Sequence, residues 1–216
     1  MRRLDEQIKA LRKEYKSGTL DQSIVESSPY LQFQAWFEAA KLSESSEANA
    51  CALATVGVDL KPSVRMVLLK GLDERGFVFF TNYESKKGVQ LAQNSQAALL
   101  FYWPSLERQV RIEGTVEQIS EQDSDAYFET RPRNAQLSAA VSQQSRVADS
   151  RAQIEGAYID LERATAGAIL ERPMQWGGYR TLPATFEFWQ GREGRLHDRI
   201  LYSLSAGIWR IDRLWP

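Results

Sequence analysis

The sequence predicts a mainly β protein with flanking helices, of the α+β class, whose antiparallel strands form a barrel or a sandwich. Runs rich in Val, Leu, Phe and Thr fill most of residues 50–119, and short turns such as Asp73-Glu74-Arg75-Gly76 separate them. Helical patterns lie before and after this region. Closely spaced strands joined by short turns favour a barrel or a sandwich over a doubly wound sheet.

Two helices are expected before the strands. Residues 1 to about 16 are highly charged, and their apolar positions recur at three- and four-residue intervals, which predicts an amphipathic helix with a thin apolar stripe. These positions are Leu4, Ile8, Leu11 and Tyr15. A polar linker follows to Ser28, which serves as the N-cap of a second helix with Pro29 in its first turn. The buried face of that helix is expected to contain Phe33, Trp36, Phe37 and Ala40.

The remaining elements follow from changes in the hydrophobic period. Strands are expected over residues 50–58, 63–69, 77–82, 97–103 and 109–119, with a short helix over 85–94. Helices are then expected over 123–130, 134–141 and 150–165, and strands over 175–179, 185–189, 195–202 and 208–214. Ser120 and Asp123 resemble a capping box, and Pro132 should end the helix that they begin.

Composition excludes several classes of function. The chain has 216 residues, enough for one domain, and its net charge of −1 gives no general attraction to nucleic acid or to an anionic membrane. With one cysteine, Cys51, and one histidine, a zinc site built by the protein is not expected, and Cys51 is interpreted as a small buried hydrophobe. No signal peptide or membrane-spanning stretch is found, so we expect a soluble, cytoplasmic protein.

The familiar catalytic and nucleotide-binding motifs are missing from the sequence. It contains neither Gly-x-Gly-x-x-Gly nor the phosphate-binding loop of nucleotide hydrolases, and it has no nucleophile elbow. Hydrolysis by a standard arrangement of side chains is therefore not expected. What remains is a set of local cationic clusters, for which phosphates are the natural partners. These clusters contain Arg65 and Lys70, Lys86 and Lys87, Arg108, Arg131 and Arg133, and the Arg195–Arg199 segment.

Ser85-Lys86-Lys87 lies where a helix is expected to begin. Free backbone N–H groups, a hydroxyl and two ammonium groups could converge there on one anion. Alternation along a strand would put Arg65 and Lys70 on opposite faces, where they could serve two different anions. The alternative for each cluster is an ordinary solvated surface.

The segment Arg195-Leu196-His197-Asp198-Arg199 holds the single histidine between two arginines. If this segment is a strand, Arg195, His197 and Arg199 project from one face, and an electron-rich group should lie against them. The alternative is a solvated edge strand whose charges discourage pairing with another sheet.

Motifs in this order and spacing closely resemble the pyridoxine/pyridoxamine 5′-phosphate oxidase family, which are FMN enzymes with a split-barrel fold. The motifs are Arg65-Met66-Val67-Leu68-Leu69-Lys70, Phe80-Thr81-Asn82, Ser85-Lys86-Lys87, Glu107-Arg108-Gln109-Val110, Tyr127-Phe128-x-x-Arg131-Pro132-Arg133, Ser142-Gln143-Gln144-Ser145, Trp176-Gly177-Gly178-Tyr179, Glu187-Phe188-Trp189-Gln190 and Arg195-Leu196-His197-Asp198-Arg199. The resemblance covers nearly the whole chain. It implies one antiparallel split-barrel domain over residues 1–216, in which residues 1–28 cover the active site.

The resemblance also implies which residues form the site. The FMN-binding residues would be Arg65, Met66, Val67, Leu68, Phe80, Thr81, Lys86, Lys87, Gln109, Gln144, Ser145, Trp189 and Arg199. The substrate-binding residues would be Arg12, Tyr15, Lys70, Tyr127, Arg131, Arg195 and His197, of which Arg195 and His197 would be catalytic. No metal is implied. The chain departs from the family pattern at Ala135, where a serine is usual, and at Lys86, where arginine is frequent.

The implied reaction transfers a hydride equivalent from C4′ of pyridoxamine or pyridoxine 5′-phosphate to FMN, and dioxygen then reoxidises the flavin to give hydrogen peroxide and pyridoxal 5′-phosphate. In this family FMN lies at the interface of a homodimer, so a homodimer is implied as well. Two alternatives stay open at this point. One is a split-barrel flavoprotein that reduces another substrate, and the other is a non-catalytic carrier of pyridoxal phosphate or FMN.

Overall fold

The computed structural model describes residues 2–11, 14–16, 18–43 and 47–216. The chain divides into two compact units, which are described separately here. Unit 1 comprises the chain up to residue 48 with residues 100–112 and 185–216, and unit 2 comprises residues 49–99 and 113–184. Three strands contribute residues to both units: β5 (Gln96–Trp103), β6 (Arg108–Gln118) and β7 (Trp176–Gln190).

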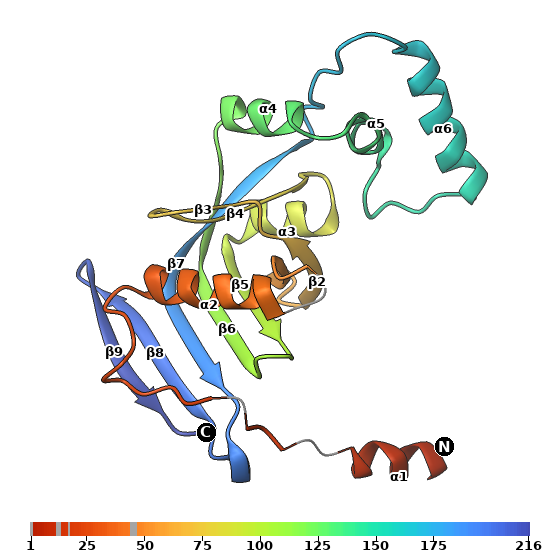
Figure 1. Cartoon of the computed structure of the whole chain (residues 1–216). Helices are drawn as coiled ribbons and strands as arrows, with labels where there is room; N and C mark the ends of the chain where they lie inside the picture. Colours follow the sequence, from red (N-terminus) through yellow and green to blue (C-terminus); the bar gives the residue numbers. More distant parts are fainter. Residues whose placement is uncertain (1, 12–13, 17, 44–46) are drawn as a thin grey trace. The chain divides into compact units, whose positions relative to one another are not determined.

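Unit 2 contains an antiparallel sheet whose strands follow the order β2-β1-β5-β6-β7-β4-β3 (Figure 1). Its own strands are β1 (Ala50–Val56), β2 (Pro62–Leu68), β3 (Gly71–Asp73) and β4 (Gly76–Asn82). The β1–β2 register runs from Ala50 opposite Leu68 to Val56 opposite Pro62. Alternate residues of β1 are buried, which includes Cys51 and Leu53 and agrees with a strand that has one face in the core.

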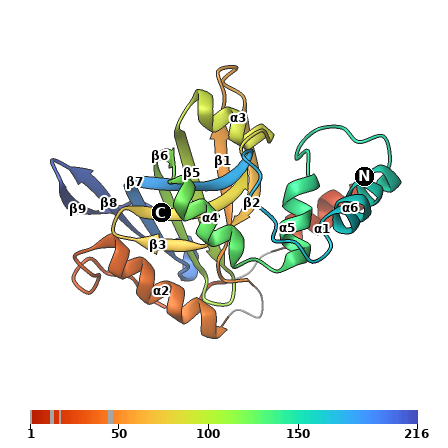
Figure 2. The same cartoon turned by 90° about the horizontal axis from the view of Figure 1, so that it is seen from above.

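Four helices complete unit 2: α3 (Lys86–Gln93), α4 (Glu121–Glu129), α5 (Arg133–Val141) and α6 (Arg151–Ala164). Helices α5 and α6 lie side by side in both views (Figures 1 and 2). A small apolar cluster joins α4 and α5 to the start of β7 through Phe128, Leu137 and Trp176. As the sequence predicted, Ser120 caps α4, because its hydroxyl accepts the Asp123 N–H at 3.0 Å.

Unit 1 contains helices α1 (Arg2–Ala10) and α2 (Pro29–Ser43), a 3₁₀ turn η1 (Glu193–Arg195), and the hairpin of β8 (Asp198–Ser205) and β9 (Ile208–Leu214). Strand β8 pairs antiparallel with both β7 and β9 (Figure 1). Aromatic side chains of α2 form the core against the strands: the ring centroids of Phe33 and Phe101 are 5.0 Å apart, and those of Trp36 and Phe188 are 5.3 Å apart. Edge-to-face pairs of this kind add to the stabilisation from burial alone.

These elements confirm the predicted mainly β class with flanking helices, and they correct four boundaries. The first helix ends at Ala10 and does not continue to residue 16, because Tyr15 packs on Trp189 and the Lys16 N–H donates to Glu107 Oε2 instead. A short strand, β3, forms in the region expected to be a turn. The other two corrections concern β7 and β8.

Strand β7 is continuous, although the sequence predicted two separate strands on either side of Pro183. The paired positions explain why proline is tolerated. Residues 176–181 pair with β4, and residues 185–190 pair with β8. Pro183 lies between these two paired segments, so its missing N–H removes no hydrogen bond from the β4 ladder or from the β8 ladder.

The strand predicted over 195–202 begins only at Asp198. Residues Glu193–Arg195 form the turn η1, within which Gly194 and Arg195 have positive φ angles of 63° and 61°, so the backbone there is left-handed and not extended. Consequently Arg195, His197 and Arg199 do not share one strand face, and this prediction was wrong.

Within the described residues, no group of three or more His, Cys, Asp or Glu side chains is placed to hold a metal ion. Nor does any helix in that part of the chain have the length and apolarity needed to cross a membrane. Cys51 is buried, and burial raises the pKa of its thiol to about 12, which agrees with its interpretation as a core residue.

Candidate active site

A buried lysine at the start of α3 forms the centre of the first candidate subsite, in unit 2. Lys87 is only 8% exposed. Its ammonium group donates to Thr81 Oγ1 at 2.9 Å, to Ser85 Oγ at 3.1 Å and to Gln144 Oε1 at 2.6 Å. All three acceptors are neutral, so they satisfy its hydrogen bonds without compensating its charge. The site therefore suits an anionic ligand.

A second cation, Arg65, adds to this positive charge. Its Nη1 donates to Leu53 O at 2.9 Å and to Thr55 Oγ1 at 2.7 Å, which again are neutral acceptors. Burial, together with the charge of Arg65, lowers the pKa of Lys87 to about 8. Two partly buried cations that destabilise each other in this way are what a phosphate group would stabilise.

Backbone geometry strengthens the subsite. Ser85 is the N-cap of α3, with its hydroxyl accepting the Gly88 N–H at 3.3 Å, so the first turn of the helix begins at Lys86. The positive end of the helix dipole and the free N–H groups of that turn favour an anion here. A Cβ on Gly88 would lie 2.1 Å from Tyr83 O, so this close turn needs glycine.

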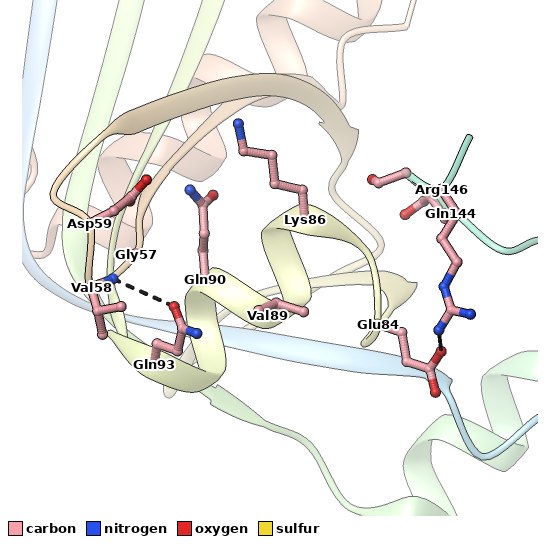
Figure 3. A pocket seen from close by; sticks show the side chains of 11 residues that line it. Gly57, Val58, Asp59, Glu84, Lys86, Val89, Gln90, Gln93, Gln144 and Arg146 are labelled. Carbon is pink, nitrogen blue, oxygen red and sulfur yellow. Dashed lines mark hydrogen bonds and ion pairs between the residues drawn. The ribbon is translucent and has the colours of Figure 1, made fainter.

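The loop after α5 closes one side of this subsite. Asn82 Nδ2 donates to Ser142 O at 3.1 Å, and Thr81 Oγ1 donates to Gln144 Oε1 at 3.1 Å. Ser145 follows with a positive φ of 74°. The loop, α3 and the β1–β2 turn enclose a cavity of about 440 Å³ (Figure 3). Its lining residues are Gly57, Val58, Asp59, Glu84, Lys86, Val89, Gln90, Gln93, Gln144, Ser145 and Arg146.

The two adjacent lysines have different positions. Lys86 is exposed and lines the cavity, whereas Lys87 is buried among hydroxyl and amide groups. On β2, Met66 is 63% exposed while Val67 and Leu68 are half-buried opposite β1. The structure thus gathers Arg65, Thr81, Lys87 and Gln144 around one point, with Lys86 and Ser145 on the wall of the adjoining cavity.

A stack of aromatic rings forms a second subsite in unit 2. The Phe80 ring centroid lies 3.8 Å from that of Tyr127 and 5.4 Å from that of Trp176, with nearly parallel planes in both cases. The guanidinium carbon of Arg131 lies 4.5 Å from the Trp176 centroid. Phe80 was assigned to FMN and Tyr127 to the substrate, so the stack brings residues from the two predicted sets into contact.

Among the described residues, Arg131 carries a polar group that lacks a partner. Its Nη1 atom is buried and makes no hydrogen bond within the described part of the chain. Burial lowers the pKa of this guanidinium, and burial raises the pKa of the nearby Tyr127 phenol. A buried, unpaired donor costs free energy, and an anionic ligand would remove that cost. By contrast, Arg133 donates to Ala168 O and Thr165 O, so it holds the chain after α6.

Unit 1 holds the third subsite, around His197. The imidazole centroid lies 4.7 Å from that of Trp189 and 5.5 Å from that of Tyr15. The backbone N–H of Arg192 donates to His197 Nδ1 at 3.1 Å, which leaves the imidazole proton on Nε2. Burial, and then the charge of Arg195, lowers the pKa of His197 and favours the neutral ring.

His197 and Arg195 line a cavity of about 630 Å³. The other lining residues are Leu11, Glu14, Tyr15, Arg192 and Gly194, so the N-terminal segment forms part of the wall. Tyr15 is packed closely there, since a Cβ on Gly191 would lie 2.7 Å from its ring. Arg12, predicted to bind substrate, lies outside the described residues.

Arg199 belongs to a different cavity of unit 1, of about 260 Å³, whose wall also includes Gln109 and Trp189. The Arg199 Nε donates to Glu187 Oε1 at 2.8 Å, and Arg111 Nη2 donates to Glu187 Oε2 at 2.5 Å. Glu187 therefore holds two arginines, and its hydrogen bond raises the pKa of Arg199. Sequence reasoning assigned Glu187 no role. An acidic residue between two phenylalanines, Phe186 and Phe188, was the signal that could have found it.

Lys70 is exposed just after β2, where its backbone N–H donates to Val78 O at 2.8 Å, so the alternation expected along a strand does not extend to it. The predicted site residues are divided between the two units. Those in unit 2 are Arg65, Met66, Val67, Leu68, Lys70, Phe80, Thr81, Lys86, Lys87, Tyr127, Arg131, Gln144 and Ser145. Those in unit 1 are Tyr15, Gln109, Trp189, Arg195, His197 and Arg199.

Comparison with known proteins identifies the family. Residues 37–162 match the family model described as pyridoxamine 5′-phosphate oxidase, and residues 176–216 match the pyridoxine 5′-phosphate oxidase C-terminal dimerisation region. A pyridoxine/pyridoxamine 5′-phosphate oxidase of Nostoc punctiforme is 51% identical over 214 residues, which cover 99% of this chain and 100% of the relative. One of Paraburkholderia phymatum is 53% identical over 207 residues, covering 95% and 97%.

Solved structures support the same fold. PhzG from Burkholderia lata, in complex with tetrahydrophenazine-1-carboxylic acid, has a TM-score of 0.86 at 28% identity and covers 92% of this chain and 98% of its own. A pyridoxamine 5′-phosphate oxidase-related, FMN-binding protein from Nostoc punctiforme has a TM-score of 0.72 at 19% identity, covering 88% and 98%. These neighbours confirm the predicted antiparallel split-barrel fold. The chain therefore belongs to the pyridoxine/pyridoxamine 5′-phosphate oxidase family and is an FMN-dependent oxidoreductase.

Proposed function

We propose that this protein oxidises pyridoxamine 5′-phosphate or pyridoxine 5′-phosphate to pyridoxal 5′-phosphate, with dioxygen as the electron acceptor. The observation that carries this proposal is Arg131. Its buried guanidinium nitrogen, which has no partner among the described residues, lies beside the Phe80–Tyr127 ring stack, so a ligand that combines an anionic group with a flat ring would suit both features. A phosphorylated pyridine is such a ligand, and relatives 51% and 53% identical carry the corresponding name.

Arg65, Lys87, Gln144 and Ser145 would hold the FMN phosphate at the start of α3, with Lys86 on the outer wall. When bound, FMN supplies the two-electron acceptor for the C4′ carbon of the substrate and transfers the electrons to dioxygen. Gln109, Trp189 and Arg199 would contact the flavin, and Glu187 would fix the direction of the Arg199 guanidinium. Met66, Val67, Leu68, Phe80 and Thr81 would complete the cofactor site.

On the substrate side, Lys70, Tyr127 and Arg131 would bind the phosphate, while Tyr15, Arg195 and His197 would orient the pyridine ring. Arg195 would stabilise negative charge that develops near C4′. Since His197 Nδ1 already accepts the Arg192 N–H, the ring would present Nε2–H as a donor to the substrate. The chain contributes position and electrostatics, which agrees with the absence of a nucleophile motif.

The overall reaction defines the reactants and products that should be measured. Pyridoxamine 5′-phosphate, dioxygen and water would give pyridoxal 5′-phosphate, ammonia and hydrogen peroxide. With pyridoxine 5′-phosphate, no water would be consumed and no ammonia released. Residues 1–216 would act as one FMN-binding domain, residues 1–28 would cover the site, and two chains would form a homodimer with FMN at their interface. The match of residues 176–216 to a dimerisation region supports the homodimer.

Oxygen uptake by the purified protein tests this function. We expect flavin absorbance, oxygen consumption on adding pyridoxamine 5′-phosphate, and an equal amount of peroxide. Arg131→Gln should raise KM about 10- to 100-fold, because a hydrogen bond from a charged donor contributes roughly 1.5–3 kcal/mol. Bound flavin without oxygen uptake would contradict the proposal and favour a carrier.

A second candidate is oxidation of a ring substrate that carries a carboxylate and no phosphate. Two observations favour it: PhzG is seen with tetrahydrophenazine-1-carboxylic acid, and this chain has Ala135 where the family usually has a serine. A panel of phosphorylated and unphosphorylated ring substrates distinguishes the two. Our proposal requires that removal of the phosphate from pyridoxamine 5′-phosphate greatly lowers kcat/KM.

A further inference from the structure

An ion pair lies at one end of the cavity beside Lys87. Arg146 Nη2 donates to Glu84 Oε2 at 2.8 Å, and both residues line this cavity. Figure 3 shows the two side chains reaching toward each other, one from the residue before the N-cap of α3 and one from the loop after α5. Neither residue belongs to the predicted set of cofactor or substrate contacts.

The ion pair is one of several connections between this loop and the segment from the end of β4 to the start of α3. The others include the hydrogen bond from Asn82 Nδ2 to Ser142 O and those that Gln144 Oε1 accepts from Thr81 and Lys87. Residues 143–150 are otherwise exposed, and Ser145 has a positive φ that serine rarely adopts without support. A loop with few buried contacts depends on such connections to keep one conformation.

The charges of Glu84 and Arg146 affect the cavity itself, in addition to connecting the loop to the start of α3. Glu84 places a carboxylate on the wall of a cavity that suits an anion, where it would repel a phosphate. Arg146 neutralises this carboxylate through the ion pair. Removing Arg146 therefore frees the loop and also leaves an unpaired negative charge in the cavity, whereas removing Glu84 frees the loop but removes the repulsion.

We propose that the Glu84–Arg146 ion pair positions the loop carrying Gln144 and Ser145 over Lys87 and thereby increases the affinity for the FMN phosphate. The inference rests on the placement of that phosphate at Lys87. Both side chains are about 60% exposed, so the pair belongs to the class of ion pairs with modest, salt-sensitive effects. Glu84 and Arg146 are positioning residues, because they act on the cofactor through Gln144 and Ser145 and do not contact it themselves.

A double-mutant cycle on FMN affinity tests the proposal. Apoprotein of Arg146→Gln, Glu84→Gln and the double variant is titrated with FMN at low and high salt. We expect Arg146→Gln to raise Kd about fivefold and Glu84→Gln to raise it at most about twofold. The double variant should raise Kd, relative to the original protein, by less than the product of these two single effects. The coupling should disappear in high salt, because an exposed pair is screened.

Two further variants make the test decisive. Exchanging the charges, Glu84→Arg with Arg146→Glu, should restore Kd to within about threefold of the original, while Glu84→Arg alone should not. Arg151→Gln breaks a comparable exposed ion pair with Glu155 on α6 and should leave Kd unchanged. Additive effects in the cycle, or no rescue by exchange, would overturn the proposal.

Failure of this inference can be told apart from failure of the phosphate placement. Lys87→Met should weaken FMN binding strongly whether or not the ion pair contributes. If Lys87→Met has no effect on Kd, the placement of the phosphate is wrong. If Lys87→Met weakens binding and the cycle shows no coupling, only the role of the ion pair is wrong.

Discussion

At the scale of single residues, the site is defined by polar groups whose charge or hydrogen-bonding capacity is not fully satisfied by their surroundings. Lys87 has three hydrogen-bond acceptors but no compensating charge among them, and Arg131 has a buried nitrogen that finds no partner in the part of the chain that the structure describes. His197 is the opposite case, because the Arg192 N–H occupies its Nδ1 and defines its tautomer. Each case predicts a measurable property.

The lowered pKa of Lys87 predicts how FMN affinity depends on pH. The ammonium group has a pKa of about 8 in the free protein, so it loses its proton as pH rises through 8. A bound phosphate dianion stabilises the charged form, so binding above pH 8 should take up a proton. We expect Kd to rise between pH 8 and 9.5, up to about tenfold per pH unit. Lys87→Met should remove this slope, and a slope that persists in Lys87→Met would show that another group titrates.

His197 is the single histidine of the chain, so its ring nitrogens can be observed without overlap. We expect ¹⁵N spectra of the free protein at pH 7 to show a neutral ring with the proton on Nε2. Because burial and Arg195 lower its pKa, the ring should become protonated only below its ordinary value of 6.5. Arg195→Met should move this titration to higher pH. A proton on Nδ1 would contradict the hydrogen bond from Arg192.

At the scale of elements, two helix starts provide a matched comparison. Ser85 caps α3 and Ser120 caps α4, each accepting the N–H three residues later. Both serines stabilise a helix end, but only Ser85 is also an acceptor for the Lys87 ammonium. The same residue type therefore has a local role in one helix and an additional site role in the other.

Alanine substitutions should separate these roles. Ser120→Ala should lower the free energy of unfolding by about 1 kcal/mol, as loss of a cap usually does, and leave FMN affinity unchanged. Ser85→Ala should lower stability by a similar amount and also raise the Kd for FMN, because Lys87 loses one of its acceptors. Urea unfolding and FMN titration measure the two effects. Equal Kd values for the two variants would contradict the assignment of Ser85 to the cofactor site.

At the scale of the whole molecule, the residues predicted to bind FMN are divided between the two units. The C-terminal residues that match a dimerisation region include Trp189 and Arg199, which are predicted FMN contacts. We therefore expect a particle of twice the chain mass in sedimentation equilibrium, with two FMN per dimer. Dilution that dissociates the dimer should release FMN at the same protein concentration. A monomer that retains FMN would contradict the proposed interface site.

Most elements follow from local patterns in the sequence. The period of apolar residues predicted β1, β2, β4, β5, β6 and β9, and hydroxyl residues before helical runs predicted the starts of α2, α3 and α4. The misplaced boundaries lie where long-range contacts or turn geometry prevail. Tyr15 continues the pattern of α1 but packs on Trp189 and His197, and a turn at Gly194 and Arg195 delays β8.

By itself, the sequence determined the fold class, the family and the identity of the charged residues, because these depend on residue type, period and spacing. Only the tertiary structure decided which of those charges are buried and what they contact. Lys87 is buried while Lys86 is exposed, Arg131 keeps a buried nitrogen that has no partner within residues 2–11, 14–16, 18–43 and 47–216, and Glu84 pairs with Arg146. The physical reason is that burial and hydrogen bonding join residues far apart in the chain, such as Lys87 and Gln144, and no local pattern records such pairs.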